Sequence, residues 1–197
     1  VNQYFGALRA NDQGALTSFA MVAFDQTVDD FEVVSVGPGT KTPATLPDLV
    51  KKAAELEVQQ KANEKEYRAW GNDLAVYPKL DRMRDVRSKG GKMSADLQAI
   101  ADKFDAFQAK DRELKKAVSD AKAAVEREKR NVALSVGQTD DIESLTGEVL
   151  SKDVDLNLTI GGQVKPYVMT LRKYELTGGT GSRMVARWVV QSLVPKG

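Results

Sequence analysis

Two residue types are missing from this chain of 197 residues, and each absence removes a class of chemistry. Without cysteine the protein has no disulfide, no thiol nucleophile and no thiolate metal site. Without histidine it has no Ser-His or Cys-His catalytic pair, no imidazole zinc site and no histidine pH switch. Any catalysis would rest on Asp, Glu, Lys, Arg or Tyr side chains, and we expect no cofactor and no metal.

The sequence also lacks a net charge of either sign and a long apolar run. Its 29 Lys and Arg residues against 28 Asp and Glu leave a formal charge of +1, so nothing in the overall charge demands a specific nucleic acid or an anionic membrane. No apolar run approaches the roughly 20 residues that span a bilayer. One hypothesis is that a signal or lipid anchor precedes Val1, which would place the protein in the bacterial cell envelope.

Composition divides the chain into a central segment and two flanks. Residues 45–136 contain 20 basic and 16 acidic residues, whereas residues 1–44 and 137–197 together contain 9 basic and 12 acidic ones. We interpret the flanks as one discontinuous α+β domain. We interpret the central segment, which interrupts this domain, as a long, antiparallel, coiled-coil-like helical hairpin. Such an insertion is tolerated because it enters and leaves through adjacent residues.

The flanks predict a four-stranded antiparallel sheet with helical turns at residues 4–8 and 16–20. Residues 31–36 are rich in β-branched and aromatic side chains, which favours a first strand. Residues 154–160 alternate apolar and polar side chains, and the Gly161-Gly162 pair that follows is typical of a tight hairpin turn. Residues 167–171 and 185–194 supply the third and fourth strands.

Apolar steps of three and four residues predict the two arms of the hairpin. The first arm carries the apolar residues Leu46, Leu49, Ala53, Leu56, Tyr67, Trp70, Leu74 and Tyr77. The second carries Leu97, Ile100, Phe104, Phe107, Leu114, Val118, Ala121, Val125 and Val132. Residues 88–92 form the expected reversal, and arms of about 40 residues would project ~60 Å at 1.5 Å per residue.

The outer half of the first arm contains two residues that disturb a helix. Because Gly71 and Pro78 disfavour a helix interior, we expect a break between Trp70 and Lys79. Folding the arms about the reversal would place Trp70 near Asp111 and Leu74 near Phe107. The polar positions in the seam, Gln60, Asn63, Asp111 and Glu128, are interpreted as fixing the register of the arms, with a binding site as the alternative.

Two short motifs in the flanks carry a resemblance. Tyr4-Phe5-x-Ala7-Leu8 and Arg187-Trp188-x-Val190 resemble the opening helix and the closing strand of the cystatin-like, nuclear-transport-factor-2-like superfamily in its small bacterial members. The resemblance implies a helix packed in the concavity of a curved antiparallel sheet, with a pocket. The long helical insertion departs from the superfamily pattern, and the acid-histidine pair of its enzymes cannot exist without histidine.

Basic residues gather where the arms reverse. They are Lys79, Arg82, Arg84, Arg87, Lys89 and Lys92, against only Asp81 and Asp85 in the same stretch. This concentration predicts a docking surface for an acidic protein, a phosphate backbone or anionic headgroups, and the alternative is an ordinary solvated turn.

Other polar groups are weaker candidates. A polar pocket in the sheet would use Tyr4, Asp25, Tyr167 and Tyr174. Residues 138–141 with Glu143 offer oxygens to a cation, although an exposed helix cap explains them better than a calcium loop. Residues 178–182 resemble a phosphate-binding turn and are better explained as a hairpin loop.

Two functional hypotheses follow. In the first, the protein is a noncatalytic interaction or scaffold protein, such as an accessory subunit of a larger assembly: the α+β body anchors or assembles, and the helical arm docks a protein partner. In the second, the sheet holds a small-molecule-binding or cyclase- or isomerase-like pocket, and the hairpin acts as its lid. The sequence leaves both open.

Overall fold

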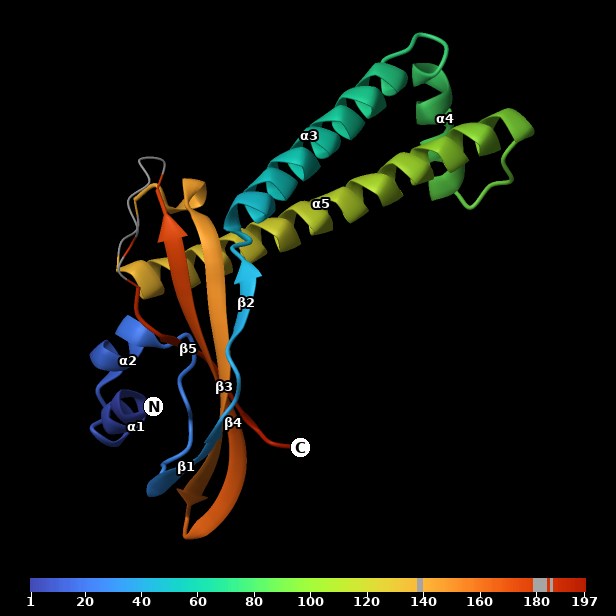
Figure 1. The fold of residues 1–197 in the computed structure, drawn as a ribbon. Helices are drawn as coiled ribbons and strands as arrows, with labels where there is room; N and C mark the ends of the chain where they lie inside the picture. The colour runs from blue at the N-terminus through green and yellow to red at the C-terminus, as the bar shows by residue number, and fades with distance from the viewer. Residues whose placement is uncertain (138–139, 179–183, 185) are drawn as a thin grey trace. The chain divides into compact units, whose positions relative to one another are not determined.

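A computed structural model describes residues 1–137, 140–178, 184 and 186–197 (Figure 1). Of these described residues 52% are helical and 26% lie in strands, and together they form five helices and an open antiparallel sheet of five strands. The α+β class and the antiparallel sheet predicted from the sequence are therefore confirmed. Within the described part of the chain, no helix combines the length and the apolarity needed to cross a membrane.

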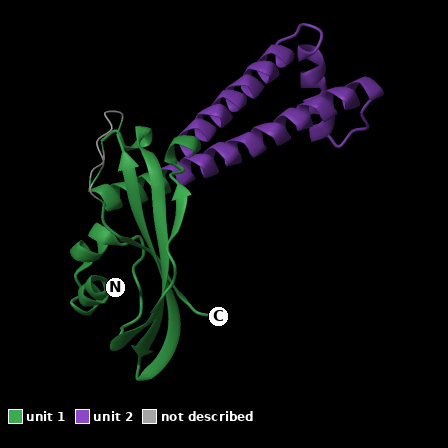
Figure 2. Ribbon diagram, viewed as in Figure 1, with its two compact units in different colours: residues 1–48, 126–197 green, residues 49–125 purple. Residues whose placement is uncertain are grey.

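The chain forms two compact units, which are coloured separately in Figure 2. Unit 1 contains residues 1–48 and 126–197, and unit 2 contains residues 49–125. The predicted domains, 1–44 with 137–197 and 45–136, stay a prediction, because a compact unit of contacts is not by itself an independently folding domain.

The sheet of unit 1 is built on one long pair of strands. β3 (Thr146–Ile160) and β4 (Gln163–Thr177) pair along their whole length. The predicted turn lies between them, where Gly161 and Gly162 have φ angles of 58° and 75°. These positive angles favour glycine, since a side chain strains the left-handed region.

The remaining strands flank this pair. β1 (Asp30–Val36) and β2 (Thr40–Pro43) both pair with β3, and β5 (Val189–Pro195) pairs with β4. The four predicted strands correspond to β1, β3, β4 and β5. The sequence missed β2, because a four-residue edge strand that ends in Pro43 has no room for an alternating pattern. Val185, where the last strand was expected to begin, lies outside the described residues, and β5 begins only at Val189, so the prediction was wrong for residues 186–188.

Two short helices cover one part of the sheet in unit 1. α1 (Asn2–Arg9) buries Tyr4, Phe5 and Ala7. These side chains share a core with the inward-facing residues of β3 and β4, namely Val154, Leu156, Leu158, Tyr167 and Met169. α2 (Gln13–Phe19) begins at Asp12, whose carboxylate accepts a hydrogen bond from the amide of Ala15 at 2.9 Å.

Unit 2 contains three helices. α3 (Leu46–Gly71) and α5 (Ala95–Val136) each extend from unit 1 into unit 2, and α4 (Tyr77–Ser88) lies wholly within it. The predicted break between Trp70 and Lys79 is confirmed, since α3 ends at Gly71 and α4 begins at Tyr77 with Pro78 in its first turn. Proline is tolerated there because the first amides of a helix have no partner within the helix.

Within unit 2, α3 and α5 run in opposite directions. Lys122 pairs with Glu57 at 2.6 Å, and the ring of Phe107 lies 5.6 Å from that of Tyr67 and 5.5 Å from that of Trp70. Trp70 therefore contacts Phe107, about one helical turn from the expected neighbour Asp111. The predicted contact between Leu74 and Phe107 is wrong, because Leu74 is 92% exposed in the connection after α3.

α4 continues neither arm of the expected hairpin. Lys79 near its start pairs with Asp96 near the start of α5, and Arg87 near its end pairs with Asp105. Both helices therefore follow the same direction along this contact. Leu80 and Met83 of α4 pack on Leu97 and Ala101 of α5. The break after Gly71 allows this arrangement, because it frees α4 from the axis of α3.

Candidate functional site

The six basic residues predicted as a docking surface all lie in unit 2. Four of them, Lys79, Arg82, Arg84 and Arg87, belong to α4, and Lys89 and Lys92 lie in the connection from α4 to α5. All six are exposed. We call this set the basic end.

Arg87 and Arg84 of the basic end are engaged by groups of unit 2. Arg87 donates two hydrogen bonds to the carboxylate of Asp105, at 2.9 and 2.8 Å. This contact raises the pKa of the Arg87 guanidinium and lowers the pKa of the Asp105 carboxyl. The guanidinium of Arg84 lies 5.7 Å from the ring centroid of Phe104 and 3.4 Å from Asp81. Both arginine side chains therefore already make contacts within unit 2.

Two lysines of the basic end are also paired. The ammonium of Lys79 lies 3.8 Å from Asp96, and that of Lys89 lies 2.7 Å from Asp85 in the preceding turn. Exposed pairs of this kind contribute little to stability, yet they reduce the charge that a partner encounters.

Arg82 and Lys92 differ from the other four. Within the described ranges of the chain, no carboxylate forms an ion pair with either side chain. Two large apolar side chains before the basic end are also exposed, Leu74 at 92% in the connection from α3 to α4 and Tyr77 at 56% at the start of α4. We call Leu74, Tyr77, Arg82 and Lys92 the unpaired set. A cationic and apolar combination of this kind suits an acidic, amphipathic partner.

The structure brings together two of the four residues predicted to form a polar pocket, Tyr4 and Tyr167. Tyr4 and Tyr167 are buried in the core of unit 1, whereas Asp25 is exposed. Tyr4 donates to the backbone oxygen of Val22 at 3.2 Å, and burial raises its pKa to about 12. Tyr174 lies outside this core cluster and uses its hydroxyl elsewhere.

Tyr174 belongs to a buried polar network that the sequence did not reveal. Its hydroxyl donates to Glu128 Oε1 at 2.9 Å, and Glu128 also accepts from Thr45 at 3.4 Å and from Asn131 at 3.2 Å. Burial, followed by the negative charge of Glu128, raises the pKa of Tyr174. Glu128 was assigned to the hairpin seam, but it belongs to unit 1.

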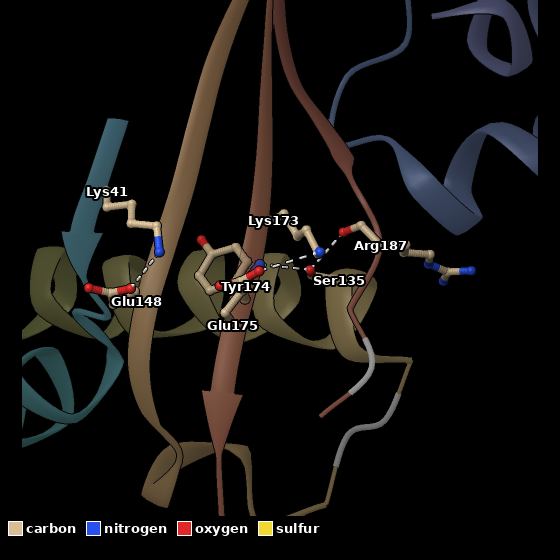
Figure 3. Close-up of polar contacts among 7 residues, drawn as sticks. All are labelled: Lys41, Ser135, Glu148, Lys173, Tyr174, Glu175 and Arg187. Carbon is tan, nitrogen blue, oxygen red and sulfur yellow. Dashed lines mark hydrogen bonds and ion pairs between the residues drawn. The ribbon is translucent and has the colours of Figure 1, made fainter. Parts of the chain in front are cut away.

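Ser135 extends this network, and Figure 3 shows its contacts. Its hydroxyl accepts from the backbone amide of Tyr174 at 3.0 Å and donates to the backbone oxygen of Arg187 at 2.8 Å. The last turns of α5 are thereby fixed to β4 and to the segment before β5. One signal could have found the network: Glu128, Asn131 and Ser135 form a polar stripe at helical spacing.

The other polar residues of the predicted seam lie in unit 2. Gln60 donates to Glu64 at 3.3 Å, and Asp111 pairs with Lys115 at 2.8 Å, which raises the pKa of Lys115. Asn63 is 2% exposed, and its Oδ1 has no hydrogen-bond partner in the described part of the chain. This buried, unpartnered acceptor agrees with a residue kept for register rather than for stability.

The described residues support neither of the two weaker loop candidates, the cation site near Glu143 and the phosphate-binding turn at residues 178–182. Glu143 forms an ion pair with Lys129 at 2.5 Å, and the residues that the structure describes contain no group of acidic side chains suited to a metal ion. Gln138 and Thr139 of the acidic loop, and residues 179–182 of the glycine loop, lie outside the described residues.

Comparisons with protein-family models, with curated proteins and with solved structures found no match to this chain. The resemblance to the cystatin-like, nuclear-transport-factor-2-like superfamily therefore stays a prediction.

Proposed function

We propose that this protein is a noncatalytic interaction protein, in which unit 2 docks an acidic protein partner and unit 1 anchors or assembles. The observation that carries the proposal is the unpaired set: Arg82 and Lys92 have no carboxylate partner within the described residues, and Leu74 and Tyr77 are exposed before and at the start of α4. We also propose that α3 and α5 act as the two arms of a helical hairpin that carries this set.

The division of the basic end favours a small docking surface. Arg84, Arg87, Lys79 and Lys89 would have to exchange a present partner for a new one, which brings little net gain. Arg82 and Lys92 can form new ion pairs without breaking old ones. Tyr and Arg are also enriched among the residues that contribute most of the binding energy of an interface. In a bound complex, an apolar side chain such as Leu74 would help to exclude water from such contacts.

The packing of unit 2 supports a stiff carrier for that surface. Tyr67, Trp70, Phe104 and Phe107 form a cluster with centroid separations of 5.5 to 6.2 Å. The ammonium of Lys103 lies 5.3 Å from the ring centroid of Trp70. Since α3, α4 and α5 all contribute to the packing of this region, the stretch that carries the unpaired set is held by more than its own helix.

For unit 1 we propose a cystatin-like body. Support comes from α1, whose Tyr4 and Phe5 are buried against the inward face of an antiparallel sheet, as the resemblance implies. The alternative of a catalytic or ligand-binding pocket at Tyr4, Asp25, Tyr167 and Tyr174 stays a hypothesis that none of their contacts favours.

The proposal is tested by charge reversal in the full chain. The double variant R82E/K92E should lose its partner, which we would capture from native extracts through a photo-crosslinking residue placed at position 74. The matched control is K52E/K110E, which makes the same change of net charge at two exposed lysines of α3 and α5. Circular dichroism should show both variants folded.

The expected result is a crosslinked protein of acidic sequence that is found with the native chain and with K52E/K110E, and is missing with R82E/K92E. Equal recovery with all three chains would contradict the assignment of the unpaired set. Equal loss in both double variants would contradict it as well, since net charge alone would then explain binding.

A further inference from the structure

Unit 1 contains a groove that neither functional hypothesis used. It has a volume of about 480 Å³, within the range of roughly 300 to 1,000 Å³ that is typical of small-molecule sites. Its lining comes from α2, from the segment after α2 and from the last turns of α5. Its apolar side chains are Leu16, Ala20, Met21, Val22, Ala23 and Leu134.

One arginine holds the walls of this groove together. The Nη2 of Arg187 donates to the backbone oxygen of Ser18 at 2.7 Å, on the α2 wall. Its Nε donates to the backbone oxygen of Leu134 at 2.7 Å, on the α5 wall. Met21 is also tied to β5, because its amide donates to the oxygen of Val190 at 2.9 Å. The groove is therefore preformed.

The charge at the groove is positive. Arg130 lines it, and no carboxylate in the described ranges forms an ion pair with this guanidinium. The acid one turn earlier on α5, Glu126, lies 3.3 Å from Lys129 instead. Arg187 gives two hydrogen bonds to neutral carbonyl groups, which do not cancel its charge. None of the lining residues is acidic.

We propose that this groove binds a single-chain aliphatic carboxylate, with the chain along Leu16, Met21 and Leu134 and the carboxylate on Arg130. An apolar groove with a guanidinium at its wall selects a ligand with one apolar and one anionic part. A planar guanidinium forms two parallel hydrogen bonds to a carboxylate, which gives the site its preference for this headgroup. The inference concerns unit 1 alone and does not depend on the docking surface of unit 2.

Dodecanoate below its critical micelle concentration is the probe, and dodecanol is the uncharged comparison. Binding to the full chain is followed by NMR of protein labelled at the methionine methyl groups. The chain has five methionines, of which Met21 lines the groove, so a shift of the Met21 signal locates the ligand. We expect dodecanoate to shift Met21 selectively, and dodecanol to bind at least about tenfold more weakly.

Three variants sharpen the test. Arg130→Gln should weaken dodecanoate about tenfold and leave dodecanol unchanged, because it removes only the charge. Ala23→Trp should abolish both, since it fills the groove from an exposed position. The matched control is Arg127→Gln, an exposed arginine of α5 that does not line the groove, and it should bind as the native chain does.

A Met21 signal that dodecanoate leaves unshifted would overturn the proposal. So would equal binding of the acid and the alcohol, or an equal loss in Arg127→Gln and Arg130→Gln, because each result removes the role of the Arg130 guanidinium.

Discussion

Tyr174→Phe is the sharpest test of the polar network that fixes α5 in unit 1. The change removes one hydroxyl, which is the donor that lies 2.9 Å from Glu128 Oε1. The remaining donor to that oxygen is Thr45, at 3.4 Å, and Asn131 donates to the other oxygen. A hydrogen bond to a charged group contributes about 1.5 to 3 kcal/mol, so we expect unit 1 to lose about 2 kcal/mol of unfolding free energy.

The two tryptophans allow each unit to be followed separately. Trp188 belongs to unit 1 and Trp70 to unit 2, and the chain contains no third tryptophan. In a Trp70→Phe background, the fluorescence signal during urea denaturation therefore comes from unit 1. With a urea dependence of about 2 kcal/mol per molar, the expected loss lowers the midpoint by about 1 M.

Tyr167→Phe is the matched control. Tyr167 is 5% exposed and packs edge to face on Phe24, with no hydrogen bond of its hydroxyl among the described residues. Tyr167→Phe removes a hydroxyl without a hydrogen bond to any described residue and should lower the free energy of unfolding by under about 0.5 kcal/mol. If Tyr174→Phe and Tyr167→Phe unfold at the same urea concentration, the contact between Tyr174 and Glu128 contributes nothing and the reasoning fails.

Two further predictions concern single buried residues. Burial raises the pKa of Tyr4 from 10.0 to about 12, so the folded state holds this proton more tightly than the unfolded state. The contribution of this proton to the unfolding free energy is therefore fully present below pH 10 and is lost as the pH rises toward 12. Tyr4→Phe should remove about 1.4 kcal/mol of the loss of stability between pH 9 and 11, measured by circular dichroism in urea. An unchanged slope of stability against pH would contradict the assignment. Asn63→Leu should stabilise unit 2 by about 1 kcal/mol, because it removes a buried acceptor without a partner, and Trp70 fluorescence in a Trp188→Phe background measures the change. Gln60→Leu is its control, and destabilisation by Asn63→Leu would show that the Asn63 amide has a partner after all.

Local patterns predicted the elements whose cause is local. The alternation of residues 154–160 placed β3, and Gly161-Gly162 placed its turn, because strand period and positive φ angles depend on a few neighbouring residues. Gly71 and Pro78 located the end of α3 and the start of α4 for the same reason. β3 also runs eight residues further toward its start than predicted, where the alternation is interrupted and pairing with β2 and β4 sustains the strand.

Side-chain contacts between residues far apart in the chain could not be predicted from the sequence. Glu128 has the spacing of a hairpin seam position, and only its contacts with Tyr174 and Thr45 show that it serves unit 1. Tyr4 and Tyr174 are candidate pocket residues by type, yet their hydroxyls are bonded to Val22 and Glu128. A side chain's chemical type does not say which distant group it meets.

Ion pairs with residues distant in the sequence also reduce the charge that the basic end offers to a partner. Summed along residues 79–92 the charge is strongly positive, but Asp96 and Asp105 of α5 approach from the other side of the connection and pair with Lys79 and Arg87. What remains for a partner is the charge of Arg82 and Lys92, which salt screens over about 8 Å under physiological conditions. Two such charges steer an approaching acidic surface and give little affinity. Under the proposed docking, affinity would come from burying the apolar members of the unpaired set, Leu74 and Tyr77. Replacing Leu74 should therefore speed dissociation more than it slows association, whereas R82E/K92E should act mainly on association.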